Sequence, residues 1–520
     1  MVSEMFQRQK MPTGSHYLSD ESKFTGKAAH IITPYTEDEV REVMRVNNSK
    51  GNPVTIRGLG TGLCGGCVPQ GGDVMTLEHL SGVVGLGRDD RGYYIRALPC
   101  TSISDIDRFL RKGDFSSLEE LSEGVRDSIV SEGTSFMYPV DPTELGGSIG
   151  GNVATNASGP RTYRYGPTRD WVRGLRVVMV DGGLLEVSRG EVKAEGRRMN
   201  FFAGRSYYSF DIPSYDSLTG VKNAAGPSIH EDMDLVDLFI GSEGVFGTIT
   251  GIDIYIVPRR GMHSVILFFP TDEDALGAVR DMRDDDIIDP EFIEYLGHGS
   301  LDLIRKVIDD DPALLRVPEI PASYKSAVFF DIPAEDCIAR YDRVRDIAVR
   351  HNSSLDMSWC GTDDVDAARM RSLRHAVPRS VFEYVASLKG RMPSIHKMGT
   401  DMAVPDENAD EMMRFYSERL EESGLEYVIF GHIGNNHPHV EIILRDMQDF
   451  EKAKVVYSEF AIKAVDLGGS PTAEHGIGKI KVDYMRMLYG EDALTRLTAI
   501  KRILDPKLIL NRGVLIGDVQ

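Results

Sequence analysis

The sequence predicts an α+β protein with two or three domains. The chain has 520 residues, whereas single domains usually have about 100–200 residues. Between residues 30 and 260, three glycine-rich blocks are flanked by short apolar runs typical of strands, such as PVTIR before the first block and DVMTL after it. After Pro258, runs such as VILFFP and AVFFDIP each lead into a charged helical stretch. This alternation predicts a second unit of sheet and helices.

Composition and charge exclude several classes of protein. Apolar residues make up 41% of the chain and charged residues 27%, which is typical of globular proteins. The 59 basic and 80 acidic residues give a net charge of −21, which argues against binding to nucleic acid or anionic lipid. The chain has no apolar run long enough to span a membrane and no signal-peptide core at its start. The five cysteines are too sparse for a disulfide framework or an iron–sulfur site. We therefore expect a cytoplasmic protein.

The first glycine block favours a backbone cradle for a diphosphate. It has seven glycines in residues 58–72 and contains a literal GxGxxG at Gly60, Gly62 and Gly65. A Rossmann site needs a helix directly after this motif, but here Gly66, further glycines and a proline lead into another strand-like run. The alternative is a nest of backbone N–H groups, to which Arg57 adds a charge. Tight turns in a β-rich fold are the competing interpretation, and the blocks at 146–159 and 238–250 weaken it.

Histidines cluster in the segment GHIGNNHPHVEIIL. His437, His439 and Glu441 alternate along a predicted strand and so project from one face. His432 precedes a glycine turn and can fold back toward the same side. A later glycine turn, AEHGIG, carries Glu474 and His475. Imidazole and carboxylate together suit Zn²⁺ or Mn²⁺, although a single histidine on a strand is more often an ordinary hydrogen-bonded residue.

These segments resemble a known family. RGLGTGLCGG, PVDPTELGGSIGGNVATNASG and LFIGSEGVFGTIT are similar to the FAD-binding domain of vanillyl-alcohol-oxidase-type flavoproteins, and within them to the FAD-linked 2-hydroxy-acid dehydrogenases. That group includes D-lactate dehydrogenase, the glycolate oxidase flavin subunit and D-2-hydroxyglutarate dehydrogenase. The resemblance implies an FAD-binding domain of two α+β subdomains over residues 1–260. It further implies a substrate-binding cap with an antiparallel sheet over residues 261–465, and a segment over residues 466–520 that returns to the FAD domain.

The resemblance also assigns the cofactor contacts. The first block and its arginine would wrap the FAD pyrophosphate, the second block would line the isoalloxazine and ribityl chain, and the third would contact the adenine half. None of the 13 histidines falls within the three blocks, so we expect non-covalent FAD. The implied cofactor-binding residues are Arg57, Gly58, Gly60, Thr61, Gly62, Gly65, Gly66, Asp141, Pro142, Gly147, Gly150, Gly151, Asn152, Asn156, Glu243, Gly244, Gly247, Ile249 and Asn511.

The family motifs GHxGDGNLH and EHGIG imply the roles of the histidine cluster. His432, His439 and Glu474 would be metal ligands, and His475 would be the general base. Arg374 and Lys397 resemble the residues that hold the substrate carboxylate.

Two departures from the family pattern affect this assignment. Between its two ligand histidines the chain reads Asn-Asn-His-Pro where the family has Asp-Gly-Asn-Leu, and Glu441 replaces a common asparagine. The extra imidazole of His437 and the Glu441 carboxylate could enlarge the ligand set, or Glu441 could repel an anionic substrate.

The leading hypothesis is an FAD-dependent dehydrogenase that oxidises a 2-hydroxy acid with the help of a divalent metal. Its electrons would pass to an external acceptor: an electron-transfer flavoprotein, an iron–sulfur subunit or a quinone. An ether-lipid synthase similar to alkyldihydroxyacetone-phosphate synthase is one alternative, and a non-catalytic flavin subunit of an electron-transfer complex is another. The chain could act as a homo-oligomer or as a complex subunit. The polar segment 189–234 receives no role from the sequence.

Overall fold

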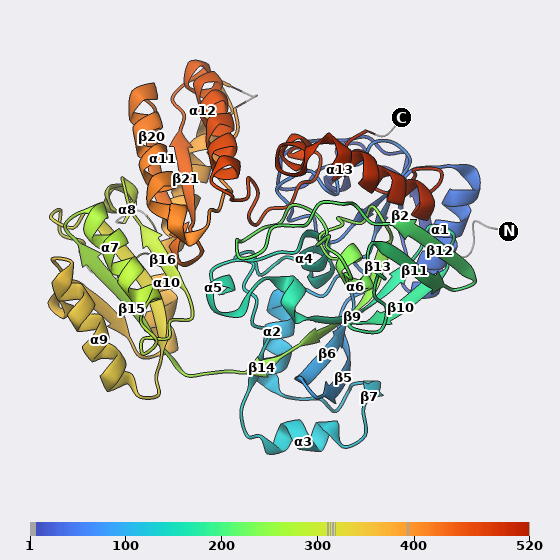
Figure 1. Cartoon of the computed structure of the whole chain (residues 1–520), viewed down its shortest axis with the longest axis horizontal. Coiled ribbons are helices and arrows are strands. Elements are labelled where there is room, and N and C mark those ends of the chain that lie inside the picture. Colours follow the sequence, from blue (N-terminus) through green and yellow to red (C-terminus); the bar gives the residue numbers. More distant parts are fainter. Residues whose placement is uncertain are drawn as a thin grey trace.

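The computed structural model describes residues 7–308, 311, 314, 317, 319–392 and 395–518. The chain forms two bodies, joined near Pro258 and again where the C-terminal tail crosses back (Figure 1). One body contains the glycine-rich segments, and the other contains a single large sheet with helices on both faces. Within the described ranges, no helix is long and apolar enough to cross a membrane.

The first body begins with a four-stranded sheet in the order β1-β2-β4-β3. Helix α1 starts at the N-cap Thr36, whose hydroxyl accepts the Glu39 N–H, and ends at Gly51 in the left-handed conformation. Its buried face packs on the sheet together with Ile509 and Leu510 of the C-terminal tail. The elements are β1 (Gln7–Lys10), β2 (His30–Thr33), α1 (Glu37–Lys50), β3 (Val54–Arg57) and β4 (Asp73–Thr76).

A six-stranded sheet in the order β10-β9-β13-β6-β5-β7 completes this body. All its neighbouring strands are antiparallel except β5 and β7. The strands are β5 (Val83–Asp89), β6 (Gly92–Ala97), β7 (Glu120–Leu121), β9 (Val172–Val178), β10 (Leu184–Ser188) and β13 (Thr248–Tyr255). Its other elements are α2 (Ile103–Lys112), α3 (Val125–Ser131), β8 (Phe136–Met137), α4 (Ile149–Thr155), α5 (Thr162–Tyr165), α6 (Leu235–Phe239) and β14 (Val257–Pro258).

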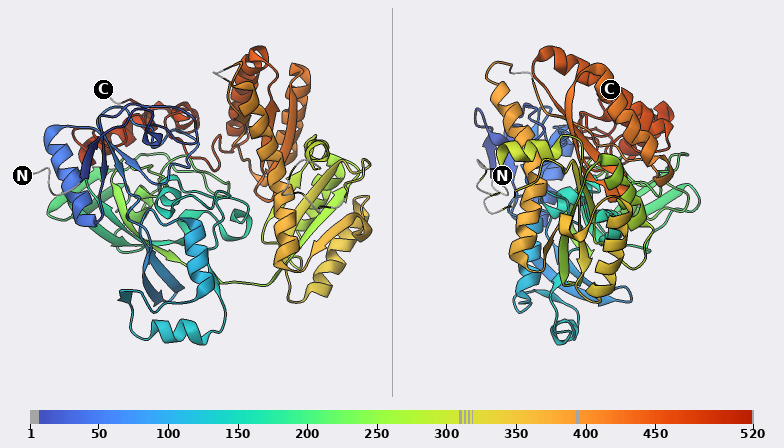
Figure 2. Two further views of the ribbon diagram at one scale, coloured as in Figure 1. Left: turned by 180° about the vertical axis from the view of Figure 1, so that it is seen from behind. Right: turned by 90° about the vertical axis from the view of Figure 1, so that its left-hand side faces the viewer.

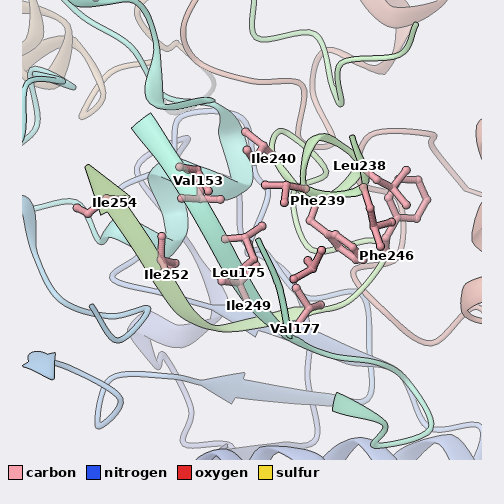
Figure 3. Close-up of a cluster of buried hydrophobic side chains, with 14 of the residues drawn as sticks. Val153, Leu175, Val177, Leu238, Phe239, Ile240, Phe246, Ile249, Ile252 and Ile254 are labelled. Atoms are coloured by element: carbon pink, nitrogen blue, oxygen red, sulfur yellow. The ribbon is translucent and has the colours of Figure 1, made fainter. Parts of the chain in front are cut away.

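The core of this body lies between that sheet and the segments that carry the glycine blocks. Figure 3 shows Leu175 and Val177 of β9 beside Ile249 and Ile252 of β13, with Val153 of α4 above them. Phe239 and Phe246, both fully buried, lie within the third glycine block. The glycine loops therefore rest on a rigid apolar base, which fixes their backbone positions.

The second body is built on a seven-stranded antiparallel sheet in the order β18-β15-β17-β16-β20-β21-β19. Successive residues of β15 face opposite sides, so Val265, Leu267 and Phe269 pack in one core, and Ile266 and Phe268 pack in another. The strands are β15 (Met262–Phe269), β16 (Ile293–Leu296), β17 (Ser326–Pro333), β18 (Ser358–Gly361), β19 (Met398–Gly399), β20 (Glu426–His432) and β21 (His437–Ile443).

Helices cover both faces of this sheet. Residues of α7, α9, α11 and α12 contribute to one core, and residues of α8 and α10 contribute to the other. The helices are α7 (Asp272–Arg283), α8 (Ser300–Val307), α9 (Cys337–Arg350), α10 (Asp364–Leu388), α11 (Ala409–Ser423) and α12 (Met447–Asp466). The fold class is therefore α+β with an antiparallel second sheet, as the sequence predicts.

The C-terminal tail returns to the first body. Helix α13 (Val482–Leu504), kinked at Gly490, buries Leu497 and Leu504 in the core of the six-stranded sheet. Figure 2 shows this helix lying against the first body and away from the seven-stranded sheet. After α13, the Val54 N–H donates to the Ile509 carbonyl (2.8 Å) and the Asn511 N–H donates to the Val54 carbonyl (3.0 Å). The tail thereby extends the sheet beside β3.

The structure confirms the local elements on which the sequence argument depends. The runs PVTIR, DVMTL, VILFFP and AVFFDIP form β3, β4, β15 and β17. No helix follows the first glycine block, because the chain runs directly from its turns into β4. This agrees with the rejection of a Rossmann site. The segment 189–234, which had no assigned role, contains the hairpin of β11 (Arg198–Ala203) and β12 (Ser206–Asp211).

Leu497 tests the importance of the returning tail. Its side chain is fully buried, whereas Ile503 on the same helix is 41% exposed. We expect Leu497→Ala to destabilise the first body by about 2–5 kcal/mol, because a large-to-small change in a packed core leaves a cavity. Ile503→Ala is the matched control and should cost roughly 1 kcal/mol or less. Thermal unfolding of both variants measures the difference, and equal midpoints would contradict this account of the tail.

Candidate functional site

A single cavity of about 1190 Å³ connects the glycine-rich loops of the first body with the histidine segment of the second. Its walls include backbone from all three glycine blocks at one end. At the other end they include His432, His439, Glu474 and His475. A cavity of this size accommodates a large cofactor together with a small substrate. Both sets of residues singled out in the sequence therefore open onto the same space.

The glycine loops are packed too tightly to carry side chains at key points. A Cβ on Gly150 of the second block would lie 2.7 Å from the Pro99 carbonyl oxygen, so this position has no room for a methyl group. Gly60 of the first block has a φ of +75°, a conformation that residues with a side chain rarely adopt. Because this backbone approaches the cavity directly, its peptide groups are available to a ligand.

Most of the cofactor-binding residues expected from the sequence line this cavity, and a few do not. Those that line it are Gly58, Gly60, Thr61, Gly62, Gly66, Pro142, Gly147, Gly150, Gly151, Asn152, Glu243, Gly244, Gly247, Ile249 and Asn511. Arg57, Gly65, Asp141 and Asn156 are not among its lining residues. The Arg57 guanidinium donates instead to the Ser19 carbonyl (2.7 Å) and contacts Cys67. Its observed contacts brace the loop from behind.

Glu243 and Asn511 tie the third glycine block to the tail. The buried Glu243 carboxylate accepts the N–H groups of Ile477 (2.7 Å) and Gly478 (2.9 Å). The Asn511 amide accepts the Ile56 N–H (2.8 Å) and donates to the Glu243 carbonyl (2.7 Å). These bonds hold the turn that carries Glu474 and His475 against the glycine loops.

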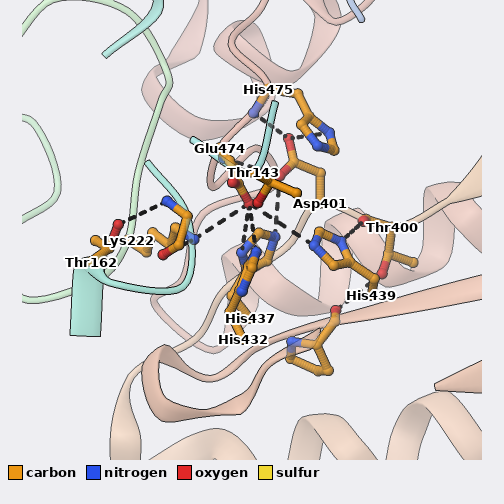
Figure 4. A network of polar contacts seen from close by, with 12 residues as sticks. Thr143, Thr162, Lys222, Thr400, Asp401, His432, His437, His439, Glu474 and His475 are labelled. Carbon is orange, nitrogen blue, oxygen red and sulfur yellow. Dashed lines mark hydrogen bonds and ion pairs between the residues drawn. The ribbon is translucent and has the colours of Figure 1, made fainter. Parts of the chain in front are cut away.

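Three imidazoles converge on one oxygen of Glu474. His432 Nε2, His437 Nδ1 and His439 Nε2 lie 3.2, 3.5 and 3.9 Å from Glu474 Oε2. The first histidine ends β20, and the other two lie on β21. Figure 4 shows the contacts meeting at Glu474, with Lys222 approaching from the first body. Lys222 Nζ lies 3.4 Å from the same oxygen, and its side chain is 1% exposed.

The outer nitrogen of each imidazole faces an acceptor. Glu294 contacts His432 Nδ1, and the Thr400 carbonyl lies 3.0 Å from His439 Nδ1. Asp401 Oδ1 lies 3.2 Å from His437 Nε2. Metal-bound histidines generally have such an outer partner, which fixes the ring orientation and tautomer.

Burial favours the neutral form of the two histidines on β21. Burial lowers the pKa of His437 to about 4, and burial together with His437 and His432 holds the pKa of His439 well below its usual value. Burial would raise the pKa of Glu474, but Lys222 and His432 hold it well below its usual range. The neutral rings of His437 and His439 beside the ionised Glu474 carboxylate are donors that fit a divalent metal.

Asp401 organises the turn that carries Glu474 and His475. Its fully buried carboxylate accepts the backbone N–H groups of both residues, at 3.0 and 3.1 Å, and the Lys481 ammonium at 2.5 Å. His475 Nδ1 lies 3.4 Å from Asp401 Oδ2. Burial would raise the pKa of Asp401, but His475 and Lys481 hold it well below its usual range. An ionised carboxylate therefore orients the His475 ring from below.

The two expected substrate-binding cations line the cavity, and each is paired with a carboxylate. Arg374 Nε donates to Glu294 Oε2 at 2.7 Å, which leaves other N–H donors of the guanidinium fork. The Lys397 ammonium lies 2.5 Å from Glu441 Oε1. Glu441 is 2% exposed, so its pairing with Lys397 neutralises the charge of both side chains at this wall.

Sequence reasoning missed Glu294, Asp401, Lys222 and Lys481. The two carboxylates could have been suspected from the sequence, since Glu294 is a charged residue in the short apolar strand IEYL and Asp401 is a lone acid in GTDMAV. No sequence pattern marks the two lysines. Lys222 comes from the segment 189–234, and only the tertiary structure brings it to Glu474.

Two protein-family models match the chain. The model described as "FAD linked oxidases, C-terminal domain" matches residues 260–515. The model described as "FAD binding domain" matches residues 28–125 and 120–188.

Several characterised relatives are similar over nearly the whole chain. The glycolate oxidase subunit GlcD of Bacillus subtilis is 26% identical over 490 residues, which cover 93% of this chain and 88% of the relative. The D-lactate dehydrogenase of Anaerostipes hadrus is 26% identical, with 96% and 92% covered. The D-2-hydroxyglutarate dehydrogenase of Xanthomonas citri pv. viticola is also 26% identical, again with 96% and 92% covered.

Solved structures share the fold at lower identity. A p-cresol methylhydroxylase with substrate bound superimposes with a TM-score of 0.63 at 14% identity, covering 96% of this chain and 92% of that one. An alkyldihydroxyacetonephosphate synthase gives a TM-score of 0.60 at 15% identity, covering 93% and 76%. These matches establish a fold of the vanillyl-alcohol-oxidase type.

Gly478 tests the packing of the tail turn on the first glycine block. A Cβ on Gly478 would lie 1.9 Å from the Cys64 carbonyl oxygen, and the residue has a φ of +53°. Gly71 has a φ of +83° but nothing within 4 Å of an added Cβ. We expect Gly478→Ala to cost about 1–3 kcal/mol more than Gly71→Ala, because only the first adds a clash to the backbone strain. Thermal unfolding compares them, and equal losses would contradict the close contact.

Proposed function

Because the chain belongs to the FAD-linked oxidases, we propose that it is a dehydrogenase that oxidises a 2-hydroxy acid to the 2-oxo acid. The observation that carries the proposal is the continuous cavity between the glycine loops and the histidine–glutamate cluster. Relatives named for glycolate, D-lactate and D-2-hydroxyglutarate support this substrate class. We propose residues 1–260 and 466–520 as the FAD-binding part and residues 261–465 as the substrate cap.

The glycine loops would hold FAD without a covalent bond. Backbone at Gly58–Gly62 and Gly147–Asn152 lines the end of the cavity where FAD would bind, and closely approaching peptide N–H groups suit a diphosphate. Bound there, FAD supplies the hydride acceptor for the reaction. The loops would orient the cofactor.

His432, His439 and Glu474 would hold a divalent metal beside the substrate. Their donor atoms face one another in a buried cluster, and each histidine has an outer acceptor. The metal supplies Lewis-acid stabilisation of the substrate hydroxyl and carboxylate oxygens. We propose Mn²⁺ or Zn²⁺ from the mixture of imidazole and carboxylate.

His475 would take the hydroxyl proton at Nε2. Its other ring nitrogen lies 3.4 Å from Asp401, which orients the ring and stabilises the imidazolium that forms. Burial lowers the pKa of His475, so the ring is neutral and ready to accept a proton near neutral pH. Asp401 acts through His475 and is a positioning residue.

The charges at the cavity wall favour a substrate with one carboxylate. Arg374 and Lys397 are each paired with a carboxylate, so this wall carries little net positive charge, although the planar guanidinium of Arg374 still offers several N–H donors to one carboxylate. A second carboxylate on the substrate would therefore meet Glu441 without a free cation beside it. We propose a monocarboxylic hydroxy acid, closer to lactate or glycolate than to 2-hydroxyglutarate.

Electrons would leave through an external acceptor, for which an electron-transfer flavoprotein, an iron–sulfur subunit or a quinone remain the candidates. The match to an alkyldihydroxyacetonephosphate synthase does not support an ether-lipid synthase activity, because a similarity at 15% sequence identity shows a shared fold and not a shared reaction. One experiment distinguishes an enzyme from a non-catalytic flavin subunit.

Anaerobic titration with D-lactate, glycolate and 2-hydroxyglutarate should bleach the flavin absorption of an enzyme, and bleaching should be slower after the metal is removed with a chelator. A flavin that none of them reduces would contradict the proposal.

His475→Ala should retain FAD absorption and metal content but reduce its flavin about 10²–10⁴-fold more slowly, the usual contribution of a general base. His298→Ala is the control, since His298 is exposed and lies outside the cavity lining. Anaerobic stopped-flow measures both rates. Unchanged reduction in His475→Ala would remove His475 from the catalytic role.

Glu441→Gln should free the Lys397 ammonium to bind a second carboxylate of the substrate. The rate of flavin reduction by 2-hydroxyglutarate, relative to that by D-lactate, should then rise by roughly tenfold or more, because one charge-assisted hydrogen bond stabilises by about that factor. Adding Lys397→Met to that variant should abolish the gain. Flavin-reduction rates with both acids give the ratio. A wild-type protein that already favours the dicarboxylate would contradict the proposed preference.

A further inference from the structure

We propose that the metal has four protein ligands, His437 being the fourth, and that the site takes a six-coordinate ion such as Mn²⁺ or Fe²⁺ in preference to Zn²⁺. The inference rests on the proposed function, because it refines the metal site of that enzyme. Three observations carry it: the buried His437 ring, whose carboxylate neighbours are not aligned for hydrogen bonds, the convergence of four donors, and the number of positions that a hydroxy acid needs.

The His437 ring is buried without a normal hydrogen bond. It is fully inaccessible to solvent, and neither of its nitrogens has a hydrogen-bond partner of acceptable geometry. A buried imidazole that is poorly hydrogen-bonded lowers the stability of the fold. Asn436, directly before it, adopts a left-handed conformation with a φ of 49° that turns the chain from β20 into β21. The fold thus places this imidazole in the cluster at a cost that a bound metal would offset.

His437 meets the cluster in the same way as the two histidines already assigned. Its Nδ1 lies 3.5 Å from Glu474 Oε2, between the values of 3.2 Å for His432 and 3.9 Å for His439. Its outer nitrogen faces Asp401, as that of His432 faces Glu294 (Figure 4). One donor atom from each of the three histidines and from Glu474 lies within 4.8 Å of the others. In its distance to Glu474, His437 matches the two histidines already proposed as ligands, although it turns Nδ1 toward the cluster where they turn Nε2.

Glu441 is not part of this set. Although its side chain lines the same cavity, its Oε1 lies 2.5 Å from the Lys397 ammonium and it is absent from the converging donors. The departure from the family sequence at position 437 therefore adds a ligand, whereas the departure at position 441 changes the substrate wall.

The number of ligands selects the metal. Zn²⁺ in proteins is almost always four-coordinate, and its catalytic sites keep one position open by using three protein ligands. Three histidines and Glu474 would occupy all four coordination positions of a zinc ion. A hydroxy acid that chelates through its hydroxyl and carboxylate needs two further positions, which makes six. Ions that readily accept six ligands of nitrogen and oxygen, such as Mn²⁺ and Fe²⁺, meet that requirement.

The test uses the metal-stripped full-length flavoprotein and Mn²⁺ alone, whose free EPR signal disappears on binding. We expect His437→Ala to weaken Mn²⁺ binding by at least about 100-fold. Even mutation of a residue that only hydrogen-bonds to a metal ligand typically lowers metal affinity by about 10–100-fold. His396→Ala, a cavity-lining histidine outside the cluster, is the matched control and should bind normally. Retained flavin absorption shows that each variant is folded. Wild-type affinity in His437→Ala would overturn the proposal.

A second measurement needs no variant. Pulsed EPR of Mn²⁺ bound to the wild-type protein should detect three directly coordinated imidazole nitrogens, and detecting only two would overturn the fourth ligand. Loading with Zn²⁺ should give slower flavin reduction than loading with Mn²⁺, and equal rates would overturn the six-coordinate ion. A protein that binds Mn²⁺ through three imidazoles but is reduced by no hydroxy acid would leave this site standing and reject the proposed function.

Discussion

The buried carboxylate of Glu474 is the constraint on which the site depends. An ionised carboxylate away from water is costly unless other groups compensate it. Here the compensation comes from separate parts of the chain: Lys222 from the first body and three histidines from the second. Glu474 itself lies on the tail, where Asp401 holds its backbone. The contacts of this one carboxylate therefore join both bodies and the tail, alongside the Arg161–Glu291 and Arg164–Asp289 ion pairs.

The same arrangement explains why the cavity is continuous. The tail turn is bound on one side by Asp401 of the second body and on the other by Glu243, whose carboxylate accepts two of its backbone N–H groups. The glycine loops and the imidazole cluster are thus held on opposite ends of one space of about 1190 Å³. In the proposed enzyme, FAD and its substrate must meet within a few ångströms, and this double attachment would provide that proximity.

Much of the fold and part of the site could be predicted because their signals are local. Continuous apolar runs predicted β15 and β17, alternation of side chains predicted β21, and the glycine blocks predicted loops that approach a ligand closely. Period-two geometry placed His437 and His439 on one face of β21. The roles of Arg57 and Asn511 were less predictable. Arg57 supports the loop from behind and Asn511 joins β3 to Glu243, and both depend on contacts between residues far apart in sequence.

The sequence by itself determined the α+β class, the family and the clustering of four site residues, because backbone periodicity and short motifs are properties of neighbouring residues. Only the tertiary structure decided which charges are paired. It brought Glu294 to His432 and Arg374, Asp401 to His475, Glu441 to Lys397 and Lys222 to Glu474. Pairing of buried charges depends on distance and burial in three dimensions, and neither is encoded in the spacing of residues along a chain.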